Sequence, residues 1–342
     1  MRDPRQVMSR EDAREWCEGW LLTPPPPAEM ATFLTGLRDR GETPEEVAGV
    51  VDAVWAHRVP IELPVMQLDC CGTGGSGRPR FNVSTVVAMV LAAMGLSVAK
   101  HGNKGSRQSN GSMDFLMALG MDLMCPDSDL SRMATDHRVV FLYARRFHPL
   151  MANVAAARAL ISGPTIFNLV GPLCNPAMPS CQVIGCPSYS MGELMAHTMA
   201  LFPHRKGWVV VGGDGGDDFS LTHPTTVWEV SQGRVRLLES PPVLGCRHLL
   251  PVGDALVNRD LFLRWLYHPD RVPALSDSLC LPVAGALVMM GYYPGWGPAI
   301  EAVQTWIESG QLAPWYQAFR IDWGLYDLAA PDLQSPHASF PI

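Results

Sequence analysis

A glycine-rich segment, CGTGGSGRPRFNVST over residues 71–85, carries the clearest chemical signal in the chain. Gly72, Gly74 and Gly77 satisfy the pattern G-x-G-x-x-G, and an apolar run typical of a buried helix follows Asn82. A strand, a glycine-rich turn and a helix N-terminus together bind anions, because unpaired backbone N–H groups and the positive end of the helix dipole converge there. The segment therefore predicts a phosphate-binding loop, with a tight turn that holds no ligand as the alternative.

The next loop argues against a nicotinamide or flavin cofactor. A dinucleotide site requires an acidic residue about 20 residues after the glycines, at the end of the following strand. Lys100 and His101 occupy that place. The P-loop consensus is absent too, because no G-K-[ST] follows the glycines. Lys104, Arg107 and Ser112 continue the second loop, which predicts a phosphate-rich sugar as the ligand.

An acidic pair, Asp217 and Asp218, follows the predicted strand GWVVVGG. Adjacent carboxylates on a loop suit a hard cation with oxygen ligands and several waters. Composition alone fits turn residues equally well. Other candidates also have structural alternatives: Ser84 as a helix N-cap, Arg158 as a surface cation and His101 as a structural histidine.

The overall composition restricts the class of protein. A hydrophobic content of 47% indicates an ordinary globular chain of 342 residues. No apolar segment approaches the roughly 18–20 residues of a membrane span, and the N-terminus has no apolar signal region, so a cytoplasmic protein without a membrane partner is expected. Nine cysteines without a C-x-x-C pair predict reduced thiols. The net charge of −7 argues against nucleic-acid binding but leaves room for a local basic pocket.

Strands and helices alternate along most of the chain and must position these residues. Residues 10–57 read as helices, one of them with Thr43 as N-cap and Pro44 in its first turn. From residue 66, strands at VMQLDCC, LSVAK, RVVFLYA, CQVIGC and GWVVVGG alternate with apolar helices. The pattern predicts an α/β fold: a small N-terminal helical domain and a large domain with a central, mostly parallel sheet covered by helices.

The domain boundaries follow from the same pattern. A second helical block over 147–172 is expected to pack on the first. We therefore expect residues 1–65 and about 146–178 to form the helical domain, 66–145 and 179–330 the α/β domain, and 331–342 a loose tail.

Several motifs, taken in order and spacing, resemble those of anthranilate phosphoribosyltransferases: CGTGGSG, FNVST, KHGN, GSMDFLMALG, HPLMANVAAARALI, PTIFNLVGPLCNP and GGDGGDDFSL. The segment RDRGETPEEVAG is similar to the family's N-terminal helical motif, and the resemblance covers about residues 12–318. It implies Mg²⁺-dependent transfer of the 5-phosphoribosyl group from phosphoribosyl pyrophosphate to the amine of anthranilate, in tryptophan biosynthesis. It also implies a homodimer joined through the helices.

The resemblance implies a set of site residues. The donor, phosphoribosyl pyrophosphate, would be bound by Gly72, Gly75, Ser76, Asn82, Ser84, Thr85, Lys100, Lys104, Arg107 and Ser112. The acceptor, anthranilate, would contact Gly72, His101, Asn103 and Arg158. Magnesium, as two ions when the donor is bound, would be held by Ser84, Asp217 and Asp218. No acid or base is needed, because the amine is already a nucleophile, so Lys100, His101 and Asn103 would act by positioning.

The chain departs from the family pattern at several positions. Ser76 replaces Asp, Arg80 a small hydroxyl residue, Ser109 Lys, Asp218 Glu and Pro282 Asn. Lys104 replaces Arg, and a lysine is a poorer bidentate phosphate ligand. Losing the carboxylate at Ser76 and gaining Arg80 make the donor pocket more positive, which predicts an altered magnesium dependence.

Three other functions remain open. The first is the same donor chemistry with a different aromatic amine as acceptor. The second is a divergent paralogue that binds a ligand or nucleic acid without catalysis. The third is a pyrimidine-nucleoside phosphorylase of similar architecture, although KHGN and the block from HPLM to Arg158 fit the transferase better.

Overall fold

The structure is a computed structural model that describes residues 3–74, 81–105, 110–245, 250 and 253–324. Three predicted site residues, Gly75, Ser76 and Arg107, lie outside the described residues. The departures at Arg80 and Ser109 and the tail over 331–342 also lie outside them.

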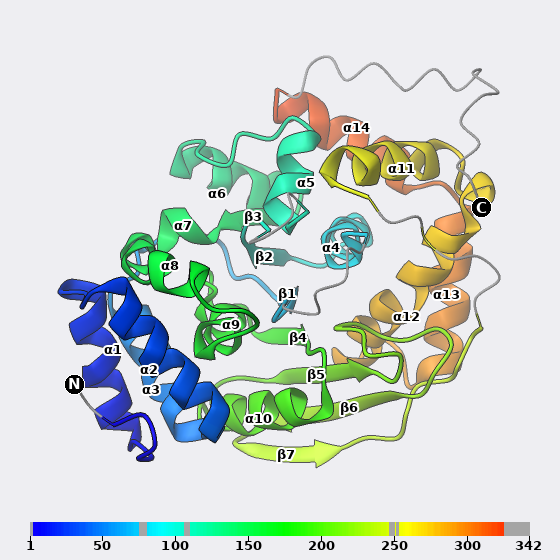
Figure 1. Cartoon of the computed structure of the whole chain (residues 1–342). Coiled ribbons are helices and arrows are strands. Elements are labelled where there is room, and N and C mark those ends of the chain that lie inside the picture. The colour runs from blue at the N-terminus through cyan, green and yellow to red at the C-terminus, as the bar shows by residue number, and fades with distance from the viewer. Residues whose placement is uncertain (1–2, 75–80, 106–109, 246–249, 251–252, 325–342) are drawn as a thin grey trace.

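A seven-stranded sheet lies at the centre of the molecule, in the order β3-β2-β1-β4-β5-β6-β7 (Figure 1). Its strands are β1 (Leu68–Gly72), β2 (Val98–Gly102), β3 (Val139–Tyr143), β4 (Cys181–Gly185), β5 (Gly207–Gly212), β6 (Thr225–Ser231) and β7 (Arg234–Leu237). The strands β1 to β5 run parallel to one another, whereas β6 runs antiparallel to β5 and β7 antiparallel to β6. The predicted mostly parallel sheet is confirmed, and the β6–β7 hairpin extends it beyond the predicted strands.

Helices cover both faces of this sheet (Figure 1). One face carries α4 (Val83–Ala93), α5 (Ser112–Ala118), α6 (Asp127–Asp136), α11 (Ala255–Tyr267), α12 (Pro273–Met289), α13 (Trp296–Glu308) and α14 (Leu312–Asp322). The other carries α10 (Tyr189–Ala200) and, beyond it, α1 (Arg10–Leu22), α2 (Pro27–Arg40), α3 (Pro44–Ala56), α8 (Ala152–Ala159) and α9 (Ile166–Val170). The short segments α7 (Ala144–Phe147), η1 (Pro149–Met151), η2 (Gly171–Cys174) and η3 (Pro269–Arg271) connect them. The helix α12 continues through the buried Pro282, which cannot donate a backbone hydrogen bond.

Two hydrophobic cores lie on opposite faces of the sheet. Every residue of β3, β4 and β5 is buried, as expected for parallel strands with helices on both sides. Side chains alternate between the faces: Trp208 and Val210 of β5 enter the core beneath α4, whereas Val209 and Val211 enter the core shared with α1, α2 and α3. The N-terminal helices therefore share a core with the sheet.

The N-terminal helices start and pack as the sequence predicts. Thr43 Oγ1 accepts a hydrogen bond from the Glu46 N–H, and the Glu46 carboxylate accepts one from the Thr43 N–H at 2.9 Å, which closes a capping box at the start of α3. The helices α8 and α9 pack against α1, α2 and α3. The domain boundaries given above stay a prediction.

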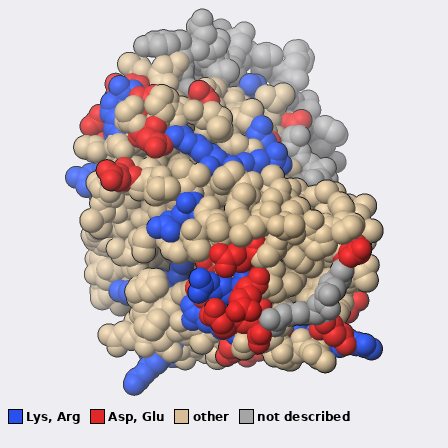
Figure 2. All heavy atoms as spheres, turned by 90° about the vertical axis from the view of Figure 1, so that its left-hand side faces the viewer, with Lys and Arg blue, Asp and Glu red and all other residues tan. Residues whose placement is uncertain are grey.

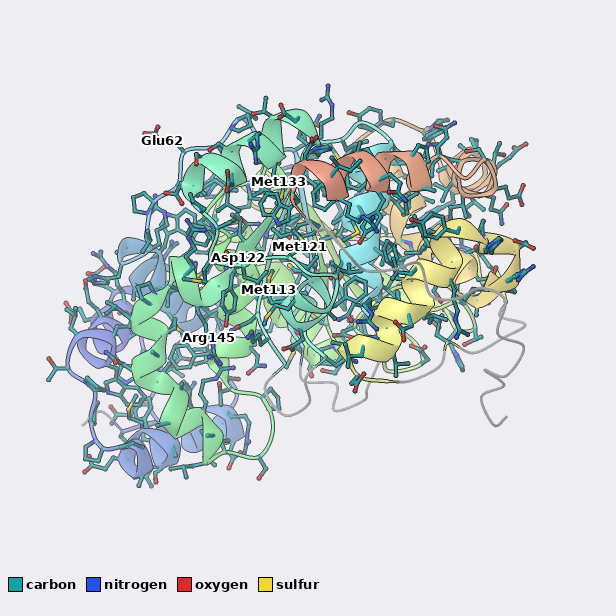
Figure 3. The ribbon with its side chains drawn as sticks, turned by 90° about the horizontal axis from the view of Figure 1, so that it is seen from above. Glu62, Met113, Met121, Asp122, Met133 and Arg145 are labelled. Carbon is teal, nitrogen blue, oxygen red and sulfur yellow. The ribbon has the colours of Figure 1, made fainter. Side chains whose placement is uncertain are left out.

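Methionines contribute to the core on the face of the sheet that carries α5 and α6. Met113 of α5, Met133 of α6 and Met121 between them are buried, whereas Glu62 and Asp122 are exposed (Figure 3). The Met113 Cε would lie 3.3 Å from a Cβ added to Gly102, so this packing reaches the end of β2. Flexible thioethers adapt to such an irregular space.

The face formed by the N-terminal helices carries acidic and basic side chains close to one another, with wide uncharged areas between them (Figure 2). A mixed surface of this kind is not typical of a phosphate-backbone contact. Among the described residues, no helix combines the length and the apolar character needed to cross a membrane.

Candidate active site at the carboxyl ends of the parallel strands

Four parallel strands end in glycine at one edge of the sheet. These are Gly72 of β1, Gly102 of β2, Gly185 of β4 and Gly212 of β5. The strand order reverses between β1 and β4, since β2 and β3 lie on one side of β1 and the later strands on the other. Open α/β sheets bind their ligands at such a switch point, outside the carboxyl ends of the strands. The predicted phosphate loop begins at this point.

The acidic pair packs directly on these strand ends. A Cβ on Gly185 would lie 1.8 Å from the Asp217 carbonyl oxygen, and one on Gly212 would lie 2.7 Å from the Asp218 carbonyl oxygen. At Gly72 a Cβ would lie 3.0 Å from Asp217 Oδ2. The loop that carries both aspartates can therefore approach the glycine loop only because these strands end without side chains. The structure brings Gly72, Asp217 and Asp218 together, as the site prediction requires.

The second predicted loop folds against β2 in the same way. A Cβ on Gly102 would lie 2.1 Å from Ser112 Oγ, so Ser112 depends on this glycine to reach the strand end. Asp114 Oδ2 accepts hydrogen bonds from the N–H groups of Gly105 (2.7 Å) and Gly111 (2.8 Å), and so draws the two sides of the loop together at the start of α5. These contacts fix the residues on either side of the part of the loop that lies outside the described residues.

Lys100 lies inside the protein rather than on an open surface. Its side chain is 2% exposed, and Nζ donates hydrogen bonds to the Cys70 carbonyl oxygen (2.7 Å) and to Ser84 Oγ (3.1 Å). Burial raises the pKa of the nearby Asp69, and the positive charge of Lys100 opposes that rise. Lys100 thus connects β1 to the first turn of α4 and holds the Ser84 hydroxyl at the switch point. Its contact with a donor stays a prediction.

The start of α4 is bound to the second loop. Asn82 occupies the N-cap position of α4 but makes no capping hydrogen bond, and Ser84 lies within the first turn. Instead, Asn82 Nδ2 donates to the Asn110 carbonyl oxygen (3.2 Å), and Asn82 Oδ1 accepts from Asn258 Nδ2 (2.9 Å). Thr85 Oγ1 is buried without a hydrogen-bond partner among the described residues. Asn258 of α11 is absent from the predicted site, because an isolated asparagine in an amphipathic helix carries no motif.

The predicted acceptor residue Arg158 reaches the glycine loop through an asparagine. Arg158 Nη2 donates to Asn168 Oδ1, and Asn168 Nδ2 donates to the Thr73 carbonyl oxygen, both at 3.4 Å. The Thr73 N–H donates in turn to the Gly185 carbonyl oxygen at 2.9 Å. Burial lowers the pKa of Arg158, and a half-buried guanidinium binds carboxylates more strongly than one in open water.

The other predicted acceptor residues lie at the end of β2. Asn103 is exposed, and its Oδ1 accepts a hydrogen bond from the Lys104 N–H at 2.9 Å. His101 is buried, with its ring 5.4 Å from that of His148 between centroids. Burial, and to a smaller extent His148, lowers the pKa of His101 to about 3. His101 is therefore neutral near pH 7, and its positioning role stays a prediction.

Magnesium fits this arrangement. Within the described part of the chain, no three or more His, Cys, Asp and Glu side chains are grouped to hold a metal by themselves. Mg²⁺ usually takes only one or two carboxylates and completes its shell with water and substrate phosphates. Burial raises the pKa of the Cys70 thiol, Lys100 opposes the rise, and Asp218 adds to it, so Asp218 lies within electrostatic reach of Cys70. Cys70 Sγ donates to the Ser84 carbonyl oxygen at 3.3 Å. Cys70 thus has Asp218 within electrostatic reach and the first turn of α4 in contact. The prediction assigns these two groups to a hard cation and to the diphosphate that it accompanies.

Comparison with known proteins agrees with this geometry. Residues 65–312 match the model of the glycosyl transferase family a/b domain, and residues 2–57 match that of the glycosyl transferase family helical bundle domain. Anthranilate phosphoribosyltransferase of Azospirillum brasilense is 37% identical over 289 residues, which cover 83% of this chain and 80% of the relative.

Two solved structures share the fold. The Saccharomyces cerevisiae anthranilate phosphoribosyltransferase in complex with PRPP and Mg has a TM-score of 0.80 at 26% identity, over 92% of this chain and 93% of that one. A variant of the same yeast enzyme in complex with 4-fluoroanthranilate has a TM-score of 0.77 at 26% identity, over the same shares of both chains. The chain therefore belongs to the anthranilate phosphoribosyltransferase family and is a pentosyltransferase, as its motifs predict.

Proposed function

We propose that the chain transfers the 5-phosphoribosyl group from phosphoribosyl pyrophosphate to anthranilate, in a reaction that requires Mg²⁺. One observation carries the proposal: the glycine loop at the switch point is shared by both halves of the predicted site. Gly72 faces Asp217 Oδ2, and Thr73 is joined through Asn168 to Arg158. A phosphorylated sugar bound on one side of this loop would thus lie next to a carboxylate bound on the other.

In this reaction the bond between ribose C1 and the pyrophosphate oxygen breaks with its electron pair leaving on pyrophosphate. The anthranilate nitrogen forms a bond to C1, and the proton that it gives up passes to the released pyrophosphate or to water. Mg²⁺, when bound by Asp217, Asp218 and Ser84, supplies positive charge to the departing pyrophosphate. The backbone N–H groups of the glycine loop and the N-terminus of α4 bind phosphate oxygens.

Arg158 and the residues at the end of β2 act on the acceptor. Arg158 binds the carboxylate of anthranilate, which fixes the direction of its amine toward C1. The neutral His101 packs behind this site and takes no proton, since its pKa of about 3 is far below the working pH. Positioning and charge stabilisation thus carry the catalysis.

The finer parts of the prediction belong to the same proposal. We propose that two magnesium ions bind with the donor, that the enzyme is a homodimer joined through its helical layer, and that it acts in the cytoplasm. The wide uncharged areas on the helical face support an interface there (Figure 2). The eight described cysteines are free thiols, which suits a reducing compartment.

A fluorescence assay tests the proposal. Protein, Mg²⁺, phosphoribosyl pyrophosphate and anthranilate are mixed, and the loss of anthranilate fluorescence is followed. Arg158→Ala should raise the acceptor KM by about 10- to 100-fold, as expected for a lost charge-assisted hydrogen bond, while calorimetric donor affinity is unchanged. Asp217→Asn should instead lower metal-dependent turnover.

A matched control removes an arginine elsewhere. Arg236→Ala on the edge strand β7, where Arg236 pairs with Glu229, should leave both KM values unchanged. Donor binding without turnover of anthranilate would point to another aromatic amine as acceptor. A chain that binds no donor would be a non-catalytic paralogue, and the proposal would be wrong.

A further inference from the structure

One fully buried amide joins the two segments that would bind the donor. Asn258 of α11 is 0% exposed. Its Nδ2 donates to Asn82 Oδ1 at 2.9 Å and to Asn110 Oδ1 at 2.8 Å. Asn82 begins α4, and Asn110 lies in the loop that leads to α5. A third hydrogen bond, from Asn82 Nδ2 to the Asn110 carbonyl oxygen at 3.2 Å, closes a triangle of three asparagines.

The side-chain amide of Asn258 can join two segments at once. An asparagine NH₂ group has two donor hydrogens, and here each of them serves one of the two segments. Asn82 makes no capping hydrogen bond to its own helix, so its side chain is committed to this network. Beside the direct hydrogen bond from Asn82 to Asn110, the separation between the start of α4 and the second loop therefore depends on one side chain from a third element.

The third element is itself held firmly. Asp254 caps α11 by accepting hydrogen bonds from the N–H groups of Leu256 and Val257, both at 3.0 Å, one turn before Asn258. Farther along the same helix, Trp265 Nε1 donates a hydrogen bond to Ser276 Oγ of α12 at 2.9 Å. The helices α11 and α5 lie beside each other (Figure 1). A group on such a rigid element can fix the geometry of a site that it does not touch.

We propose that Asn258 is a positioning residue of the donor site. It holds the N-terminus of α4 and the second loop at the separation at which both can contact one phosphoribosyl pyrophosphate. Its side chain is buried behind Asn82 and Asn110, so it acts through them and not on the ligand. The inference rests on the proposed function of the site, because it assigns the donor as the molecule that both segments bind.

Three variants separate positioning from simple destabilisation. Asn258→Asp keeps the shape, removes both donor hydrogens and adds a buried carboxyl group, whereas Asn258→Leu removes all polarity without adding charge. Phe262→Leu, in the core beneath the same helix, weakens its packing without changing a residue of the network. Asn258→Asp and Asn258→Leu should weaken donor affinity, measured by calorimetry with Mg²⁺, and raise the donor KM by about 10- to 30-fold, as expected for two lost hydrogen bonds. The acceptor KM should change less than twofold.

The control and a double variant complete the test. Phe262→Leu should lower the melting temperature while the donor affinity stays within threefold of the wild type. In Asn258→Leu combined with Asn110→Leu, the loss of donor affinity should be less than the product of the single losses, because both changes break the same network. Folding of each variant is checked by circular dichroism.

Two results would overturn the inference alone. One is wild-type donor affinity in the folded Asn258→Asp variant, and the other is an equal loss of donor affinity in Phe262→Leu. A wild-type protein that fails to bind phosphoribosyl pyrophosphate would instead overturn the proposed function, and the inference with it.

Discussion

His101 illustrates how burial decides the chemistry of a single side chain. The folded protein holds its pKa at about 3, whereas an unfolded histidine titrates near 6.5. Between these values the unfolded chain binds one more proton than the folded one. The stabilising contribution is therefore present above about pH 6.5 and is lost as the pH falls toward 3.

Replacement of His101 should flatten this pH dependence. Between pH 7.5 and pH 5.5, the free energy of unfolding of the wild type should fall by about 1 kcal/mol more than that of His101→Gln. Urea denaturation at the two pH values measures the difference. The exposed His223 provides the control, because His223→Gln should follow the wild type. Parallel behaviour of all three proteins would mean that His101 titrates normally.

Ser76 tests the predicted magnesium dependence. The family resemblance implies that this position lies near the metal, where a carboxylate would add an opposite charge, so Ser76→Asp should lower the Mg²⁺ concentration for half-maximal rate by about three- to tenfold, equivalent to roughly 0.7–1.4 kcal/mol. The uncharged Ser76→Asn should behave as the wild type. A steady-state magnesium titration at saturating substrates gives the comparison, and an unchanged response of Ser76→Asp would disprove the altered metal dependence.

The sequence predicts site residues best where a motif coincides with a strand end. Gly72 and the pair Asp217–Asp218 belong to motifs, and the structure brings them together at the switch point. The position of Lys100 beneath Ser84 and the neutral state of His101 could not be read from the motif KHGN, because both depend on burial by distant segments. Asn258 has no local signal at all, since its partners are 148 and 176 residues away.

At the scale of elements, the strand-end glycines determine how closely the loops approach the sheet. Gly185→Ala places a methyl group where the Asp217 carbonyl oxygen lies, so the acidic loop must move. We expect kcat to fall at least tenfold and the free energy of unfolding to fall by about 1–3 kcal/mol. Steady-state kinetics with urea denaturation measures both effects.

The chain offers a matched alanine substitution. Gly19 is exposed in α1, and a Cβ there meets nothing within 4 Å. Gly19→Ala should leave kcat unchanged and raise the free energy of unfolding by about 0.5–1 kcal/mol, because alanine favours the helix. If Gly185→Ala were as active as Gly19→Ala, the close packing of the Asp217 loop would have no bearing on catalysis.

The hairpin β6–β7 shows why some strands cannot be predicted from their sequence. Its strands TTVWEVS and RVRL are joined by Gln232 and Gly233, both with positive φ (51° and 71°), as in the two-residue turns that favour hairpins. A Gln-Gly turn is a weaker hairpin signal than Asn-Gly, and β7 is a short strand of four residues that are mostly exposed. The parallel strands are instead largely buried runs bounded by turn residues, and four of the five end in glycine, so the sequence predicts them more readily.

At the scale of the whole molecule, the helical layer and the sheet share one core. Trp16, Val50 and Phe167 from the helical segments and Val209 from β5 belong to the same buried cluster. Neither part can lose its packing without exposing the other. We therefore expect the helical layer and the sheet to unfold together, although two family models divide the chain at about residue 60.

A substitution in the helical layer tests this coupling. Val50→Ala should lower the free energy of unfolding by roughly 2 kcal/mol. The urea transitions followed by tryptophan fluorescence and by far-ultraviolet circular dichroism should coincide and shift together. Two separated transitions, with only the first one shifted, would show that the helical layer unfolds independently.

The burial of Lys100 has a practical consequence for chemical footprinting. The chain has only three lysine side chains, Lys100, Lys104 and Lys206. Lys206 is exposed and Lys104 is partly exposed, whereas Lys100 is buried, with its amine hydrogen-bonded to Ser84 of α4. An amine-reactive reagent should therefore acylate Lys206 and Lys104 quickly and leave Lys100 unmodified until the sheet opens, and peptide mapping by mass spectrometry would follow the label on each of the three lysines.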